Sequence, residues 1–121
     1  MVFEHAKVRI YVITMLNGEN RFNPSFLRDF LDRLDEVEQE VQNCNGLEGW
    51  GAALITTGGG GQPAGKFYSN GIDLRWVAER REAQDNDALR TLGKLFGAAV
   101  ARILSFSIPT FAGTLSPATS Y

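Results

Sequence analysis

The sequence predicts an α/β fold in which helices cover a parallel β-sheet. Two runs rich in β-branched and apolar residues, 8–16 and 51–57, have the composition of strands. The second is a continuous apolar run, which is typical of a strand buried on both faces of a parallel sheet. An amphipathic helical pattern lies between them, and this order of elements indicates α/β layers. The 121 residues allow one domain with a modest core.

The first helix is predicted to begin at Asn23-Pro24, since asparagine is a preferred N-cap and proline fits the first helical position. Its apolar residues recur at helical spacing and should face the core, whereas the acids between them should face water. The pattern ends near residues 43–46. The expected buried stripe comprises Phe26, Leu27, Phe30, Leu31, Leu34, Val37 and Val41.

The second half of the chain is predicted to contain two more helices and one more strand. A glycine run at 58–61 indicates a flexible loop, and a short helix is expected at about 73–82. A longer helix follows, and residues 107–112 are predicted to begin a third buried strand with Pro109 at its edge. The buried stripe expected on the longer helix comprises Leu89, Leu92, Phe96, Val100, Ile103 and Leu104.

Composition excludes several classes of protein. A formal net charge of −2 gives no overall electrostatic footprint for nucleic acid or for an anionic membrane surface. No apolar stretch is long enough to span a membrane, and the first residues lack the design of a secretory signal. The single Cys44 cannot form an internal disulfide, which fits a reducing compartment. We therefore expect a soluble protein without nucleic-acid partners.

The residues do not support three familiar kinds of catalytic site. Residues 60–66 have the spacing of a phosphate-binding P-loop, but Phe67 stands where a magnesium-holding hydroxyl is needed. No metal site is expected, because the chain has one histidine and no cluster with ligand spacing. A Ser-His-Asp triad would need His5, which lies on the first segment, where a surface histidine is expected.

The run 65–74 is the most informative feature, because it joins an apolar strand to a helical pattern. Gly71 permits a positive φ and lets a ligand approach the backbone. The Ile72 N–H would emerge at a helix N-terminus, with Asp73 in the first turn. Such a junction can polarise a carbonyl or hold an anion. Taken alone, the local residues favour a capped turn between layers over a catalytic device.

The wider pattern resembles the enoyl-CoA hydratase/isomerase (crotonase) superfamily. It combines Asn20-Arg21-Phe22-Asn23-Pro24 before a helix, the strand 53–57, the run 65–74, and residues 108–113 after a long helix. The order and spacing hold from about residue 6 to 113, and the run 67–74 looks closest to plant-type peroxisomal Δ3,Δ2-enoyl-CoA isomerases. The resemblance implies the N-terminal portion of a crotonase-like (ClpP/crotonase) β-β-α superhelix over residues 1–113, with a divergent tail at 114–121.

The resemblance also implies a chemistry and a site. The family binds acyl-CoA thioesters and holds an enolate oxygen with two backbone N–H groups, and it needs no cofactor beyond the CoA of the substrate. The first N–H would come from Ile72, after Gly71. The backbone around Ser69 and Asn70 would lie against the adenine of CoA, and Arg21 and Phe22 would flank the opening through which CoA enters. Full-length members form trimer-like homo-oligomers, and the isomerases serve fatty-acid β-oxidation in the peroxisome.

After Gly113 the chain departs from the family. The family continues with Asn-Gly-His and a glycine-rich turn that supplies the second N–H, and then with the catalytic carboxylate, whereas this chain has Thr114-Leu115-Ser116-Pro117. We therefore expect a truncated enoyl-CoA isomerase that is inactive on its own. Two alternatives stay open: a hydratase, and a non-catalytic acyl-CoA-binding fragment. The last residues, 119–121, are not a peroxisomal signal, so a cytoplasmic location is the other expectation.

Overall fold

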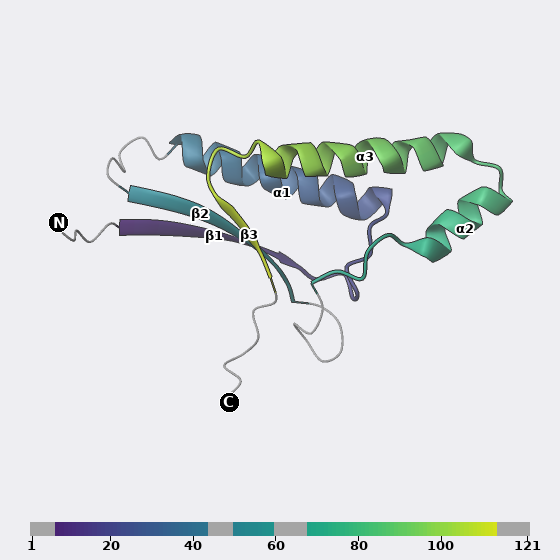
Figure 1. Cartoon of the computed structure of the whole chain (residues 1–121), viewed down its shortest axis with the longest axis horizontal. Coiled ribbons are helices and arrows are strands. Elements are labelled where there is room, and N and C mark those ends of the chain that lie inside the picture. Colours follow the sequence, from purple (N-terminus) through teal and green to yellow (C-terminus); the bar gives the residue numbers. More distant parts are fainter. Residues whose placement is uncertain (1–6, 44–49, 60–67, 114–121) are drawn as a thin grey trace, which may run out of the picture.

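A computed structural model describes residues 7–43, 50–59 and 68–113 of the chain (Figure 1). The described elements are β1 (Lys7–Met15), α1 (Pro24–Asn43), β2 (Trp50–Gly58), α2 (Leu74–Glu82), α3 (Asn86–Leu104) and β3 (Thr110–Ala112). The predictions made for His5, for Cys44, for the P-loop-like run 60–66 and for the tail 114–121 lie outside the described residues.

The strands form a parallel sheet in the order β1-β2-β3. β1 pairs with β2 along its whole length, from Lys7 opposite Trp50 to Met15 opposite Gly58. β2 is the central strand. Its Leu54, which faces the helices, is 0% exposed, whereas Ile55 on the opposite face is only partly buried. The predicted burial on both faces is therefore confirmed only in part. The α/β class is confirmed, and the crotonase-like superhelix stays a prediction.

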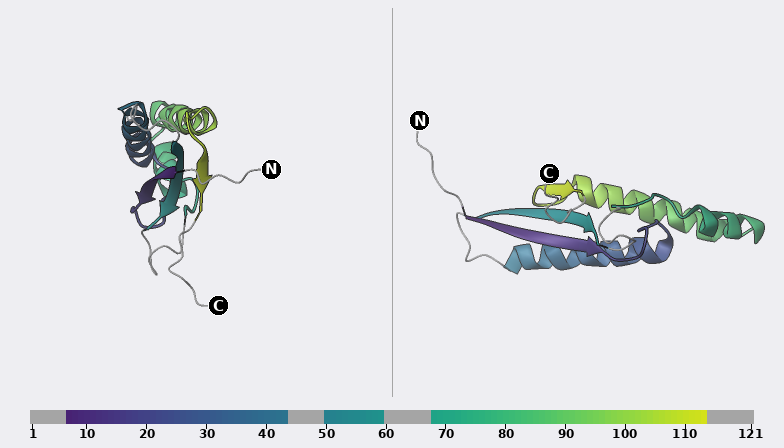
Figure 2. Two further views of the ribbon diagram at one scale, coloured as in Figure 1. Left: turned by 90° about the vertical axis from the view of Figure 1, so that its left-hand side faces the viewer. Right: turned by 90° about the horizontal axis from the view of Figure 1, so that it is seen from below.

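Helices α1 and α3 lie side by side on one face of the sheet (Figures 1 and 2). Burial of the apolar stripe of α1 holds this layer in place, because each buried leucine or phenylalanine contributes about 1.5–3 kcal/mol. The prediction for α1 is confirmed, since its apolar stripe is buried or partly buried throughout while five of its six acids are exposed. Buried residues form two clusters: Met15, Phe26, Leu27, Leu92 and Ala99, and Ile13, Leu34, Val37 and Leu54.

The face of the sheet away from these helices is apolar and largely exposed. Val8, Ile10 and Val12 alternate along β1 and are each about half exposed. The prediction for residues 107–112 was right about a strand and wrong about its burial. Because β3 lies at the sheet edge and Phe111 pairs with Ile55, the Phe111 side chain belongs to the uncovered face and is 59% exposed.

The buried stripe predicted for α3 was also partly wrong. Leu92 is buried as expected, but Leu104 is 83% exposed, and Phe96 and Val100 are exposed as well. Ala99, which the prediction left out, is buried. The physical reason is that α3 packs against α1 on the side that carries Leu92 and Ala99. The adjacent side of α3 faces an open cavity instead.

Candidate active site

The segment before α2 runs parallel to the segment before α1. The Phe22 N–H donates to the Gly71 carbonyl at 2.8 Å, and the Asp73 N–H donates to the Phe22 carbonyl at 3.0 Å. These bonds make an isolated parallel bridge between Phe22 and Ile72. The bridge brings together all the site residues that the sequence predicts: Arg21, Phe22, Ser69, Asn70, Gly71 and Ile72. Their roles stay predictions.

The turn depends on a glycine. Gly71 has φ +82°, a conformation that side-chain-bearing residues rarely adopt. A Cβ on Gly71 would meet nothing within 4 Å, so the backbone conformation and not the available space requires glycine. The Ser69 hydroxyl accepts a hydrogen bond from the Gly71 N–H at 3.0 Å and donates to the Asn20 carbonyl at 2.6 Å.

The Ile72 N–H is the free donor of this turn. In a trans peptide the N–H is antiparallel to the preceding carbonyl, and the Gly71 carbonyl points at Phe22. The Ile72 N–H therefore points away from Phe22, and it makes no hydrogen bond with any residue in the described ranges. It lies just before Asp73, the N-cap of α2, where the helix dipole is positive.

The first turns of α1 and α2 are capped and linked. Asn23 Oδ1 accepts from the Phe26 N–H at 2.9 Å, which confirms the predicted N-cap of α1. Asp73 Oδ1 accepts from the Trp76 N–H at 3.1 Å, so Asp73 is an N-cap and not a first-turn residue. Asn23 Nδ2 donates to Asp73 Oδ2 at 3.2 Å. The two helix starts are thereby held against each other beside Ile72.

Arg21 is partly exposed to solvent and hydrogen-bonds to the turn. Its guanidinium donates to the Asn70 carbonyl at 3.1 Å and pairs with Glu19 at 2.7 Å. The Asn70 N–H donates to the Glu19 carbonyl at 2.9 Å. A hydrogen bond from the Asn70 side chain, followed by the hydrogen bond and charge of Arg21, lowers the pKa of Glu19 below its ordinary value of 4.5. The pair is solvent-exposed, so its contribution to stability is small.

Asn20 is the main residue that sequence reasoning missed. It is 0% exposed and has φ +54°. Its Nδ2 donates to the Tyr68 carbonyl at 2.9 Å and to the Met15 carbonyl at 3.3 Å, and its Oδ1 accepts from the Asn17 N–H at 3.0 Å. From the sequence, Asn20 was expected only to be the first residue of the run that precedes the first helix. The available signal was that asparagine is enriched at positive φ.

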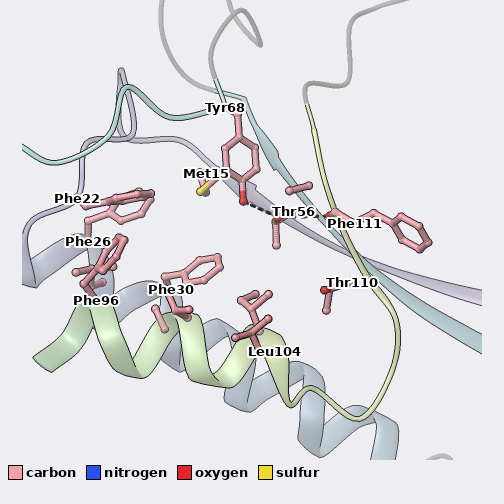
Figure 3. A pocket seen from close by; sticks show the side chains of 15 residues that line it. Met15, Phe22, Phe26, Phe30, Thr56, Tyr68, Phe96, Leu104, Thr110 and Phe111 are labelled. Atoms are coloured by element: carbon pink, nitrogen blue, oxygen red, sulfur yellow. Dashed lines mark hydrogen bonds between the residues drawn. The ribbon is translucent and has the colours of Figure 1, made fainter. Parts of the chain in front are cut away.

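An apolar cavity of about 460 Å³ opens between the helices and the sheet (Figure 3). Its volume lies in the range of about 300–1,000 Å³ typical of small-ligand sites. The Thr56 and Tyr68 hydroxyls hydrogen-bond to each other in its wall, 2.7 Å apart. Most of its lining is apolar, with Met15, Phe22, Phe26, Leu27, Phe30, Phe96, Ala99, Val100, Ile103 and Leu104 among the lining residues. Phe22 and Tyr68 both line this cavity. Phe22 also belongs to the segment before α1, and Tyr68 to the segment before α2 that contains the turn.

The chain is similar in sequence to two curated plant proteins. The peroxisomal enoyl-CoA delta isomerase 2 of Arabidopsis thaliana is 30% identical over 106 residues, which cover 85% of this chain and 39% of that protein. Over these residues the chain is similar in sequence to an enoyl-CoA delta isomerase. The Arabidopsis enoyl-CoA delta isomerase 3 is 27% identical over 107 residues, covering 85% of this chain and 38% of that relative. The predicted resemblance to the enoyl-CoA hydratase/isomerase superfamily is confirmed.

The chain spans about two fifths of the length of these isomerases. No protein-family model matches the chain, and no solved structure matches it significantly. None of the helices in the described ranges is both long and apolar enough to cross a membrane. Among the described residues no three histidine, cysteine, aspartate or glutamate side chains are grouped as metal ligands would be.

Proposed function

We propose that the chain forms the acyl-CoA-binding part of an enoyl-CoA isomerase of fatty-acid β-oxidation, in which the Ile72 N–H polarises the thioester carbonyl. The observation that carries this proposal is the Ile72 N–H itself, which is unpaired within the described residues and lies at the positive end of α2. The relatives named enoyl-CoA delta isomerases support the substrate class.

The proposed reaction moves a double bond from the 3 to the 2 position of the acyl chain. A base removes a proton from C2, the electron pair moves into the thioester carbonyl to give a dienolate, and a proton is returned at C4. Negative charge develops on the thioester oxygen, so a fixed N–H donor stabilises the transition state more than the substrate. One such donor contributes about a hundred- to a thousandfold in rate. We assign neither the base nor the second donor to a described residue.

The cavity is the proposed site of the fatty acyl chain. Phe22 and Tyr68 join the cavity wall to the turn, so a thioester at Ile72 could extend its tail along them. Each CH₂ group transferred from water into such an apolar site contributes about 0.8 kcal/mol. Affinity should therefore rise with the length of the chain until the cavity is filled.

The CoA side of the site is proposed from the resemblance. Arg21 lies at the outside of the turn, half-exposed, where a phosphate or the adenine could reach it. The Ser69 hydroxyl already bonds within the chain, so we propose that Ser69 and Asn70 meet the adenine through their backbone. No cofactor beyond the CoA of the substrate is proposed.

The remaining expectations belong to the whole protein. A location in the peroxisome is proposed from the name of one relative, the peroxisomal enoyl-CoA delta isomerase 2, and a trimer-like homo-oligomer is proposed from the family resemblance. The crotonase-like superhelix and the boundary at residue 113 are proposed on the same ground. No observation favours the hydratase or the non-catalytic fragment. The predicted inactivity of the 121-residue chain stays a prediction, and measured turnover of a 3-enoyl-CoA by the purified chain would contradict it.

The test is the carbonyl stretching frequency of bound decanoyl-CoA carrying ¹³C at the thioester carbon. A hydrogen bond from Ile72 should lower this frequency relative to free decanoyl-CoA, because it weakens the C=O bond. The variant Ile72→Pro removes the N–H and should lose most of the shift, whereas Ile72→Val keeps the N–H and serves as its matched control. Absence of binding, or an unshifted carbonyl in the native chain, would overturn the proposal.

A further inference from the structure

The peptide that carries the Ile72 N–H follows one that is held at both ends. In the peptide joining residues 70 and 71, the Asn70 carbonyl accepts from Arg21 at 3.1 Å and the Gly71 N–H donates to Ser69 Oγ at 3.0 Å. The next peptide is held at its carbonyl by the Phe22 N–H at 2.8 Å. A glycine between two peptides allows either plane to rotate at little cost. The direction of the Ile72 N–H therefore depends on these hydrogen bonds.

Ser69 has a double role in this arrangement. Its hydroxyl accepts from the Gly71 N–H and donates to the Asn20 carbonyl at 2.6 Å, so both its hydrogen and a lone pair are used. A side chain without a hydroxyl would leave both partners unsatisfied in a half-buried place. The Ser69 hydroxyl therefore ties the turn directly to the segment that contains Asn20.

Asn20 holds the segment before α1 against the turn. It is wholly buried, and its amide spans from the end of β1 to the turn, through Met15 at 3.3 Å and Tyr68 at 2.9 Å. Its carbonyl is the one that Ser69 binds. Because Asn20 lies two residues before Phe22, its position sets where the Phe22 N–H meets Gly71.

We propose that Asn20 and Ser69 are positioning residues that together aim the Ile72 N–H at the thioester oxygen. The inference rests on the proposed function, and it assigns a role that neither side chain performs by touching substrate. The Ser69 hydroxyl fixes the peptide before Gly71, and Asn20 fixes the Phe22 N–H that orients the peptide after it. Loss of either side chain should weaken polarisation of the carbonyl.

The first test uses the chain without ligand and measures amide hydrogen exchange by NMR. The Gly71 N–H is bonded and the Ile72 N–H has no partner in the described residues, so Gly71 should exchange more slowly than Ile72 in the native chain. Ser69→Ala should speed exchange at Gly71 about tenfold. Equal exchange at the two amides of the native chain would overturn the inference even if every variant failed to fold.

The second test compares ¹³C-decanoyl-CoA bound to the native chain, Ser69→Ala, Ser69→Thr and Asn20→Asp. Ser69→Thr retains a hydroxyl and should restore the native carbonyl shift, whereas Ser69→Ala should lose at least half of it. Asn20→Asp removes the Nδ2 donor to Tyr68 and should also reduce the shift. Asn20 is not among the residues proposed to meet CoA, so affinity for unacylated CoA should change less than threefold in Asn20→Asp. Ser25→Ala, at an exposed serine of α1, is the matched control.

The outcomes separate the two proposals. No carbonyl shift in the native chain would overturn the proposed function and this inference with it. A native shift that Ser69→Ala and Asn20→Asp retain in full would leave the proposed function standing and overturn the inference. Loss of the shift in Ser69→Ala together with rescue by Ser69→Thr would support both. Far-ultraviolet circular dichroism of each variant distinguishes loss of polarisation from loss of fold.

Discussion

The Phe22 N–H donates to the Gly71 carbonyl, at 2.8 Å, across two segments that lie far apart in the sequence. This bond turns the peptide between Gly71 and Ile72 so that the Ile72 N–H points to the other side. A donor that is free because its neighbours are bonded is pre-organised, and it needs no rearrangement when charge develops on a ligand.

Alanine substitution should have opposite effects at two glycines. Gly71→Ala should lower the free energy of unfolding by about 1–2 kcal/mol, because φ +82° is strained for alanine although the space is open. Gly93→Ala, in the exposed interior of α3 and also with open space, should raise it by about 1 kcal/mol. Urea denaturation measures both. A stabilising Gly71→Ala would show that the turn does not need a positive φ.

The hydroxyl pair in the cavity wall should couple energetically. Tyr68→Phe and Thr56→Val each remove one partner of the 2.7 Å hydrogen bond and should each destabilise the fold by about 1 kcal/mol. The double variant should cost less than the sum of the single ones, because the bond is lost only once. A double-mutant cycle with urea denaturation gives the coupling energy. If the two effects are additive, the hydrogen bond between the two hydroxyls contributes no coupling energy to stability.

The proposed acyl site predicts a change in chain-length dependence. Val100 lines the cavity and is 44% exposed, so Val100→Trp should fill part of the cavity without unfolding the chain. In the native chain each added CH₂ should strengthen acyl-CoA binding about fourfold. Val100→Trp should flatten this dependence beyond short chains, measured by calorimetry from acetyl- to decanoyl-CoA.

The matched control for this experiment is Lys94→Trp, on the same helix but outside the cavity lining. Both variants add the same aromatic side chain to α3, and only one of them occupies the site. If affinity rises with acyl-chain length equally in the native protein and in Val100→Trp, the acyl chain binds outside this cavity.

Acid should loosen the outer side of the turn. The pKa of Glu19 in the folded chain is lowered from 4.5, first by the hydrogen bond from Asn70 and then by Arg21. A lowered folded-state pKa gives stability that is present above pH 4.5 and is lost as the pH falls through the lower folded value. The effect should be small because the carboxylate is exposed. Glu19→Gln should reduce the fall in urea midpoint between about pH 5 and pH 3, and an identical fall would contradict the assignment.

Local sequence was enough for the elements and for the capping of the first helix. Asn23-Pro24 predicts the start of α1, and Asn23 caps it. Runs rich in β-branched and apolar residues predict β1 and β2 to within about a residue at each end. These features depend on side-chain spacing and on the conformational preferences of neighbouring residues, which the chain carries before it folds.

Burial on α3 and β3 could not be predicted in this way. Phe96, Val100 and Leu104 have helical spacing and still face an open cavity, while Ala99 is buried. The apolar character of a residue shows that it can be buried, but it does not show that it is. Which side of α3 is covered depends on how the neighbouring helix α1 packs against it. Phe111 is exposed for the same reason, since no described element packs on its face of the sheet.

The sequence by itself determined the α/β class, the order of the elements, the glycine turn and the relation to enoyl-CoA isomerases. The first three follow from periodicity and from the preference of glycine for positive φ. The relation to the isomerases rests on resemblance to known sequences. Tertiary structure alone decided that Asn20 and Ser69 hold the turn and that the Ile72 N–H is left unpaired among the described residues. The direction of a backbone N–H depends on hydrogen bonds from a segment distant in sequence, which exist only once the two segments meet.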